Sequence, residues 1–130
     1  MKIIILDDSL TVRMIIESYL EDLGVEDDEM FSFEDGHKAI EFIKLNGADI
    51  VFSDINMPLM DGFEFAKQVF TLLPNLKKTF FAISGDETKE SYIKMKESGV
   101  RHFLKKPISS LHFNHFVLPQ ILKQRNVDEL

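Results

Sequence analysis

The feature of the sequence that most constrains its fold is a regular alternation of short apolar runs with stretches long enough to form helices. Five runs predict β-strands, at residues 2–6, 29–33, 49–53, 79–84 and 102–105. Strict alternation of strands and helices is typical of a parallel sheet with helices on both faces. The first, third and fourth runs are almost entirely apolar, so we expect them at the centre of the sheet, and the more polar second and fifth runs at its edges.

Capping residues predict where the intervening helices begin. Ser9 can cap the first helix, which Gly24 would end. The apolar residues of that helix recur at spacings of three and four and should form its buried face: Val12, Ile15, Ile16, Tyr19, Leu20 and Leu23. The caps predicted for the other four helices are Asp35, Asp61, Asp86 and Ser109.

The last two predicted helices have unusual features. The fourth has only a thin apolar stripe of Thr88, Tyr92 and Met95, so we expect it to be weakly attached to the core. The fifth contains Pro119, which should kink or end it, because a proline inside a helix costs about 3 kcal/mol.

The acidic run at residues 26–29 is interpreted as a solvated turn.

Length and charge exclude several classes of protein. The 130 residues match one domain, and the net charge of -7 should repel nucleic acid phosphates, so we expect no direct nucleic acid binding. No apolar run approaches the length of about 18 residues that a membrane helix needs, so we expect no membrane insertion. The first residues do not resemble a secretory signal and there is no cysteine, which favours a cytoplasmic protein.

Chemically complementary side chains follow four of the predicted strands. The first strand is followed by Asp7 and Asp8, the third by Asp54, the fourth ends in Ser84, and the fifth precedes Lys106. In an open parallel sheet, ligands bind beyond the carboxyl ends of the strands. If the first and third strands are neighbours, three carboxylates converge there, with a hydroxyl and an ammonium group facing them.

Three carboxylates this close raise one another's pKa and need a cation if they are to stay ionised. An all-oxygen set of ligands suits Mg²⁺. With Mg²⁺ on one side and Lys106 on the other, a tetrahedral dianion could be held against Asp54, which would be the nucleophile of a phosphoryl transfer. Each residue alone could instead cap a helix or start a turn, but five complementary strand-end residues together favour the chemistry.

These residues and their neighbours resemble the response regulator receiver domains, in particular those of the stand-alone chemotaxis CheY type, over residues 2–122. The motifs that carry the resemblance are Asp7-Asp8, Asp54 with Asn56-Met57-Pro58, Asp61-Gly62, Ser84-Gly85 and Lys106-Pro107. The resemblance implies a flavodoxin-like α/β fold with a five-stranded parallel sheet in the order 2-1-3-4-5 and five helices on both faces. It also implies a receiver domain at residues 1–125 and a C-terminal tail at 126–130.

The resemblance implies a role for each matched residue. Asp54 is the phosphoacceptor, and Mg²⁺ is bound by Asp8, Asp54 and the backbone carbonyl of Asn56, with Asp7 acting through water. Lys106 and Ser84 bind the phosphoryl group.

Further roles follow from the same family. The Lys106–Pro107 bond is expected to be cis. Phe103 matches the switch aromatic, and an ordinary core aromatic of the edge strand is the alternative. Asn56 and Asp86 match the positions that tune hydrolysis of the aspartyl phosphate and suggest a fairly short-lived signal.

The sequence departs from the family's common pattern at three positions. Ser84 stands where threonine is common, and Gly85 stands where the family often has alanine. Phe103 replaces the tyrosine typical of the chemotaxis proteins and has no hydroxyl to offer a partner.

The resemblance predicts a two-component response regulator that accepts a phosphoryl group from a histidine kinase. Its phosphorylation would switch the binding of a downstream effector or flagellar motor component through the fourth helix, fifth strand and fifth helix. It would be no enzyme, apart from assisting its own phosphorylation and dephosphorylation.

Three alternatives differ from this prediction. A haloacid-dehalogenase-like phosphohydrolase is disfavoured because Ser9, not an acid, stands two residues after Asp7. A flavodoxin-like electron carrier would need a phosphate-binding loop after the first strand, and a binding module with a vestigial site would not need the full acidic set. His112 and His115 are interpreted as surface or packing residues, not metal ligands.

Overall fold

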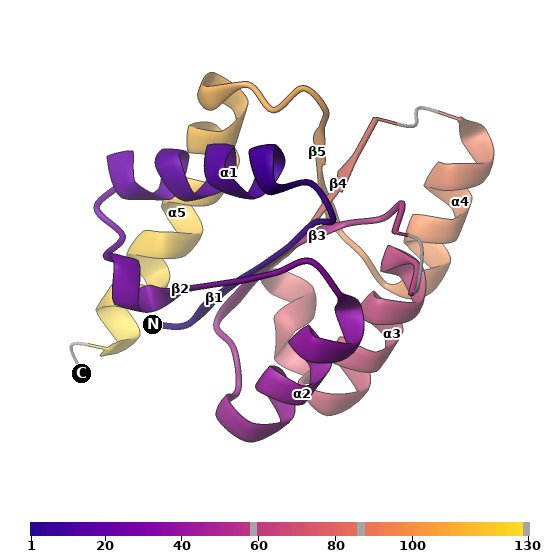
Figure 1. Ribbon diagram of the computed structural model, residues 1–130, viewed down its shortest axis with the longest axis horizontal. Helices are drawn as coiled ribbons and strands as arrows, with labels where there is room; N and C mark the ends of the chain where they lie inside the picture. The colour runs from indigo at the N-terminus through magenta and orange to yellow at the C-terminus, as the bar shows by residue number, and fades with distance from the viewer. Residues whose placement is uncertain (58–59, 86–87, 129–130) are drawn as a thin grey trace.

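Five parallel strands form a single sheet in the order β2-β1-β3-β4-β5 (Figure 1). The computed structural model describes residues 1–57, 60–85 and 88–128. Its strands are β1 (Ile3–Leu6), β2 (Met30–Phe33), β3 (Ile50–Asp54), β4 (Phe80–Ser84) and β5 (His102–Lys105). The predicted strand order is therefore confirmed.

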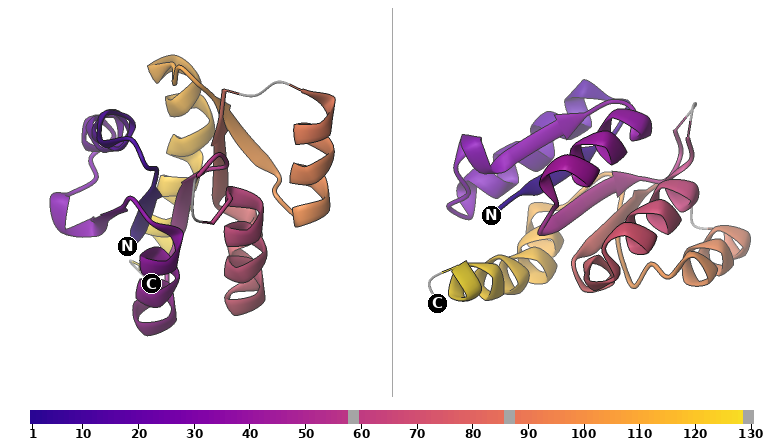
Figure 2. Two further views of the ribbon diagram at one scale, coloured as in Figure 1. Left: turned by 45° about the vertical axis from the view of Figure 1, so that its right-hand side comes forward. Right: turned by 90° about the horizontal axis from the view of Figure 1, so that it is seen from below.

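Helices cover both faces of the sheet (Figures 1 and 2). One face carries α1 (Leu10–Asp22) and α5 (Ser110–Asp128), and the other carries α2 (Gly36–Asn46), α3 (Gly62–Leu72) and α4 (Lys89–Ser98). Two short 3₁₀ helices, η1 (Asp27–Glu29) and η2 (Pro74–Lys78), precede β2 and β4. No helix in the described ranges is long and apolar enough to cross a bilayer.

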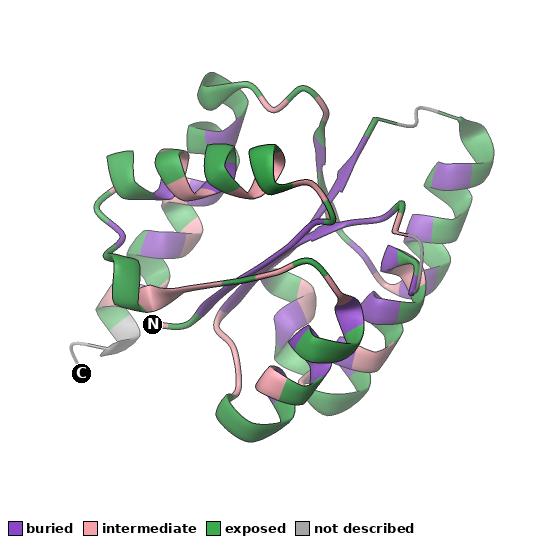
Figure 3. Cartoon of the chain, in the orientation of Figure 1, coloured by how far each residue is buried: buried purple, intermediate pink, exposed green. Residues whose placement is uncertain are grey.

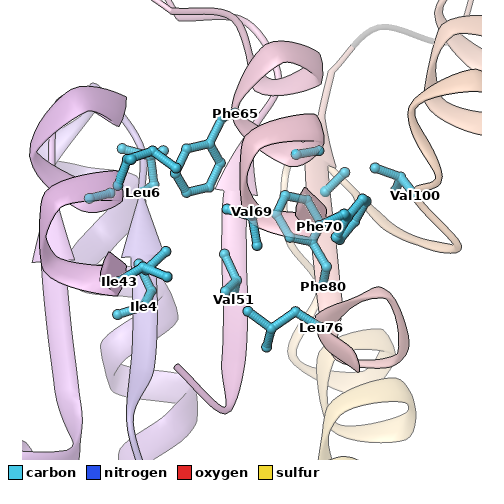
Figure 4. Packing of buried hydrophobic residues seen from close by; sticks show 14 of the residues in the cluster. Ile4, Leu6, Ile43, Val51, Phe65, Val69, Phe70, Leu76, Phe80 and Val100 are labelled. Atoms are coloured by element: carbon cyan, nitrogen blue, oxygen red, sulfur yellow. The ribbon is translucent and has the colours of Figure 1, made fainter. Parts of the chain in front are cut away.

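The core is divided into two clusters by the sheet. Strands β1, β3 and β4 are buried along their whole length, as predicted for central strands, whereas β2 and β5 are partly exposed (Figure 3). Consecutive side chains of β3 enter opposite clusters: Val51 packs with the α2 and α3 residues (Figure 4), and Phe52 packs with those of α1 and α5. Burial on both sides holds the central strands rigidly, which fixes the positions of the loops that follow them.

Most predicted helix starts are confirmed. The side chains of Ser9, Asp35 and Asp61 accept hydrogen bonds from backbone N–H groups in the first turns of α1, α2 and α3, and Ser109 does so weakly for α5. On α1, however, Ile15 is exposed, because the buried face is centred on Ile16 and Leu20.

The start of α4 differs from the prediction. The capping residue is Thr88, whose hydroxyl accepts from the Ser91 N–H, so the assignment of the cap to Asp86 was wrong; Asp86 itself lies outside the described residues. The buried face of α4 consists of Ser91, Met95 and Ser98, and Tyr92 is 41% exposed. Serines bury little apolar surface, so the core contact of this helix depends mainly on Met95.

Helix α5 continues through Pro119 and ends only at Asp128, so of the two effects predicted for this proline, the ending of the helix was wrong and the kink stays a prediction. The helix keeps one face in the core on both sides of the proline, with Val117 and Ile121 both buried. Near its end, the guanidinium of Arg125 donates to both carboxylate oxygens of Glu29, at 2.9 and 3.0 Å. This burial and ion pair offset the one backbone hydrogen bond that a proline removes.

Candidate functional site

Three carboxylates meet at the carboxyl ends of β1 and β3. The two strands pair in register with Leu6 opposite Ser53, which makes Asp7 and Asp54 neighbours. Asp7, Asp8 and Asp54 each offer an oxygen, and these oxygens lie within 4.8 Å of one another. Asp7 and Asp54 are buried, at 0% and 2% exposure, whereas Asp8 is exposed. The predicted convergence of the three acids is confirmed.

Asp7 has one oxygen satisfied and one oxygen without a hydrogen bond. Its Oδ1 accepts from the Ser9 N–H at 2.8 Å, and its backbone carbonyl accepts from the guanidinium of Arg13 at 3.0 Å. Its buried Oδ2 has no hydrogen-bond partner among the residues that the structure describes, although the Lys106 ammonium lies 3.1 Å away as an ion pair. A buried carboxylate oxygen of this kind is suited to contact a cation or its bound water.

Asp54 is the last residue of β3 and is held from two directions. Its Oδ1 accepts from the Asn56 N–H at 3.1 Å and lies 3.5 Å from Lys106 Nζ. Lys106 therefore lies between the two buried carboxylates and is itself 28% exposed. The arrangement places one cation against two anions, which leaves the group of three acids with an excess of negative charge.

Burial raises the pKa of both internal acids. For Asp54, burial is the largest effect and raises the pKa. The hydrogen bond from the Asn56 N–H lowers the pKa, the charge of Asp7 raises it, and the charge of Lys106 lowers it. The pKa of Asp54 remains raised overall. For Asp7 burial again raises the pKa, and the Ser9 N–H and Lys106 offset part of the rise. A divalent cation at this site would favour the ionised form of both groups.

The loop after Asp54 is fixed by Gly62. The Gly62 N–H donates to the carbonyl of Ile55 at 3.0 Å, and a Cβ on Gly62 would lie 2.4 Å from Ile55 Cα and 2.5 Å from the carbonyl oxygen of Asp54. Neither backbone atom can move aside without moving the end of β3. Position 62 of the Asp61-Gly62 motif therefore accommodates only glycine.

Lys106 is positioned by its neighbours on both sides. Its N–H donates to the Ser84 carbonyl at 2.8 Å, and the Lys106–Pro107 bond is cis, as predicted. Two residues further on, the carbonyl of Ile108 accepts a hydrogen bond from the Tyr19 hydroxyl of α1 at 2.9 Å. From the sequence, Tyr19 was predicted only to lie on the apolar face of the first helix. The spacing of apolar residues along a helix contains no information about a hydrogen bond to a residue 89 positions away.

Two more predicted site residues, Ser84 and Phe103, lie on the neighbouring strands β4 and β5. Ser84 is buried at the end of β4, one residue beyond Ile83, the partner of Asp54 in the sheet. Phe103 is 38% exposed and meets Tyr92 of α4 edge to face, at 5.3 Å between ring centroids, so the alternative of a core aromatic was wrong. Its role as a switch stays a prediction, as do the roles of Ser84 and Asp86, the last of which lies outside the described residues.

Comparison with known proteins agrees with this geometry. Residues 3–117 match the model of the response regulator receiver domain. The chemotaxis protein CheY-3 of Vibrio cholerae is 30% identical over 110 residues, which cover 85% of this chain and 83% of that protein.

Solved structures show the same fold. The chemotaxis protein CheY4 of Vibrio cholerae superimposes with a TM-score of 0.73 at 28% identity, covering 96% of this chain and 95% of that one. The signal receiver domain of a histidine kinase from Syntrophus aciditrophicus has a TM-score of 0.80 at 23% identity, covering 94% and 90%. The chain therefore belongs to the response regulator receiver domain family and is a CheY-like receiver of two-component signal transduction.

Proposed function

We propose that Asp54 is the phosphoacceptor of this receiver and that a histidine kinase is its phosphodonor. The observation that carries the proposal is the placement of Lys106 between Asp7 and Asp54, at 3.1 and 3.5 Å, beside three clustered carboxylates. Asp54 is the one of these acids whose backbone ends a central strand and whose Oδ1 is held by the next loop. Its Oδ2 is then the oxygen that attacks phosphorus.

The donor set fits Mg²⁺, because three carboxylates supply hard oxygen ligands and Asp7 Oδ2 is buried without a hydrogen bond in the described part of the chain. Asp8, Asp54 and the backbone carbonyl of Asn56 would hold the ion, with Asp7 reaching it through water. When bound, the ion neutralises charge on the phosphoryl oxygens and keeps the acids ionised.

The reaction transfers one phosphoryl group between two nucleophiles. A bond forms between Asp54 Oδ2 and phosphorus while the phosphorus–nitrogen bond of the kinase phosphohistidine breaks, and the nitrogen keeps that electron pair. The Asn56 N–H and Lys106 hold Oδ1 and so fix the direction of the carboxylate. The Lys106 ammonium then pairs with an oxygen of the product phosphoryl group, assisted by the Ser84 hydroxyl.

The output of this reaction would be a change in the surface formed by α4, β5 and α5. Phosphorylation would draw Ser84 toward the phosphoryl group and allow Phe103 to leave its contact with Tyr92 and rotate inward. Moving such an equilibrium from mostly off to mostly on takes about 5.5 kcal/mol, so Lys106, the metal ion and Ser84 must act together. Because Met95 is the one buried apolar side chain of α4 in the described part of the chain, little apolar contact is lost when this helix moves.

The family supports a proposal for the biological setting. The chain is a receiver, not a classical enzyme, and its chemistry would be limited to assisting its own phosphorylation and dephosphorylation. We place it in the cytoplasm, with a downstream effector protein or flagellar motor component as its target. The amide of Asn56 and the acid at position 86 suggest that the phosphoryl group is fairly short-lived.

The test is intact mass after incubation with acetyl phosphate and Mg²⁺. The unmodified chain should gain one phosphoryl group, and Asp54→Asn should gain none. Ser84→Ala should still accept the group but lose most of the phosphate-dependent change in partner binding. An equal adduct on Asp54→Asn would refute the assignment of the phosphoacceptor.

A further inference from the structure

A pocket of about 810 Å³ lies at the end of the sheet where the strands begin, opposite to the end that carries Asp54. It is lined by η2, by the residues at the amino ends of β3 and β5, and by the second half of α5, so it opens between the two helical layers. Its volume falls in the range of roughly 300 to 1,000 Å³ that is typical of sites for small molecules. Nothing in the proposed phosphorylation chemistry uses this part of the molecule.

Three cations from three separate segments line this pocket. Lys78 comes from η2, Arg101 precedes β5 and Lys123 lies on α5. None of them forms an ion pair with any residue in the described ranges. The chain as a whole carries a net charge of -7. The pocket is therefore a locally positive site on a negatively charged protein.

One carboxylate, that of Asp49, also lines the pocket. Its Oδ2 accepts from the Lys2 N–H at 2.7 Å, which ties this acid to the start of the chain. The three cations therefore outnumber the acid, and a further anion can enter without displacing an existing salt bridge.

The floor of the pocket is held by hydrogen bonds and by ring stacking. The Thr79 hydroxyl donates to the carbonyl of Asp49 at 2.7 Å, and its N–H donates to the carbonyl of Leu76 at 3.1 Å. The ring of His102 stacks on Phe81 at 5.2 Å. A pre-formed floor lowers the entropy that a ligand must lose on binding.

We propose that this pocket binds a small molecule that carries two or more linked phosphate groups. The Arg101 guanidinium can pair with two oxygens of one phosphate, and Lys78 and Lys123 supply point charges for its neighbours. The side-chain amides of Asn75, Gln120 and Gln124 line the same pocket and can donate to and accept from the rest of the ligand. A nucleoside triphosphate and an inorganic polyphosphate share the required chemistry.

The test uses adenosine triphosphate and inorganic tripolyphosphate as probes, titrated without divalent metal into ¹⁵N-labelled protein. We expect saturable amide shifts at residues 76–79, 101–102 and 120–124, and none that saturate at residues 54–56. The double variant Arg101→Ala/Lys123→Ala should bind the tighter probe at least about tenfold more weakly. The matched double variant Lys44→Ala/Lys67→Ala removes the same charge from exposed sites on α2 and α3 and should bind as the unmodified chain does.

The two probes identify the source of the phosphates. Tighter binding of the nucleotide shows that the amides contact the nucleoside, whereas equal binding shows that the phosphates alone are recognised. Amide shifts that do not saturate, or equal weakening in both double variants, would overturn the proposal, because either result is general charge attraction. The experiment is independent of Asp54, so a failure of phosphorylation there would not affect its outcome.

Discussion

Replacing Asp54 with asparagine should stabilise the metal-free fold at neutral pH. The Asp54 carboxylate is almost fully buried and its oxygen lies within 4.8 Å of those of Asp7 and Asp8. Two unit charges at that separation repel by about 3.5 kcal/mol at an effective dielectric constant of about 20. Asparagine has nearly the same shape as aspartate, and its side-chain oxygen can still accept the hydrogen bond from the Asn56 N–H. It carries no charge, so it removes both the repulsion between the carboxylates and the cost of burying a charge.

The loss of the contact with Lys106 opposes this gain. An ion pair at 3.5 Å is worth about 5 kcal/mol by the same estimate, but the ammonium is partly exposed and keeps Asp7 at 3.1 Å as a partner. The desolvation of a buried carboxylate, which costs several kcal/mol, tips the balance. We expect the free energy of unfolding of Asp54→Asn to exceed that of the unmodified chain by about 1 to 2 kcal/mol.

The effect has a definite pH dependence. The pKa values of Asp7 and Asp54 are raised in the folded state above their ordinary value of 3.8. Stability linked to these groups is therefore fully present below pH 3.8 and is lost as the pH rises through the raised values. The advantage of Asp54→Asn should shrink as the pH is lowered from about 7.5 toward 3.8, since the neutral aspartic acid then resembles asparagine.

Urea unfolding followed by far-ultraviolet circular dichroism measures the effect, because the chain has no tryptophan. With EDTA present, the unfolding midpoint should rise by about 0.5 to 1 M urea for Asp54→Asn. Mg²⁺ at about 100 times its dissociation constant should add about 2.7 kcal/mol to the unmodified chain and far less to the variant. Asp28→Asn, on an exposed residue, should shift neither quantity. A midpoint for Asp54→Asn that is unchanged or lower at pH 7.5 would refute the electrostatic account.

Three further predictions concern residues that support the site or the fold. Gly62→Ala should destabilise the protein by about 3 kcal/mol or more in urea unfolding, because its Cβ meets backbone atoms; a loss below 1 kcal/mol would contradict the close approach. Tyr19→Phe should slow phosphorylation by acetyl phosphate several-fold with little change in stability, since it frees the carbonyl of Ile108 in the loop that carries the lysine; an unchanged rate would show that the hydroxyl does not position the loop. Glu29→Gln should lower stability at pH 7, because Arg125 lowers the pKa of Glu29 below its ordinary value of 4.5, and the difference should shrink only as the pH falls from 4.5 through that lowered value; a pH-independent difference in unfolding midpoint would contradict it.

The strand-end cluster could be predicted because the parallel sheet itself determines it. Apolar runs buried on both faces identify the central strands, and the residue after each such run must emerge at the same edge of the sheet. This places Asp7, Asp54 and Ser84 close together once the strand order is known. The caps Ser9 and Asp61 were predictable for a similar reason, since each acts within three residues of its own position.

Contacts between distant residues could not be predicted in the same way. The Arg125–Glu29 ion pair joins residues 96 positions apart, and it helps to explain why α5 continues past Pro119. The cap of α4 was misplaced because the sequence offers two residues that favour an N-cap, Asp86 and Thr88, and local chemistry does not choose between them. The exposure of Phe103 likewise depends on where α4 packs, which no spacing in the sequence encodes.

We propose that the phosphoryl group is taken up on the carboxylate of Asp54 within this acidic cluster. The most direct test of this proposal is borohydride reduction after incubation with acetyl phosphate and Mg²⁺, followed by peptide mapping, because reduction converts an aspartyl phosphate to homoserine. We predict homoserine at position 54 in the presence of Mg²⁺ and none in its absence. Homoserine at position 7 or 8, or a yield at position 54 that does not depend on the metal, would contradict the account.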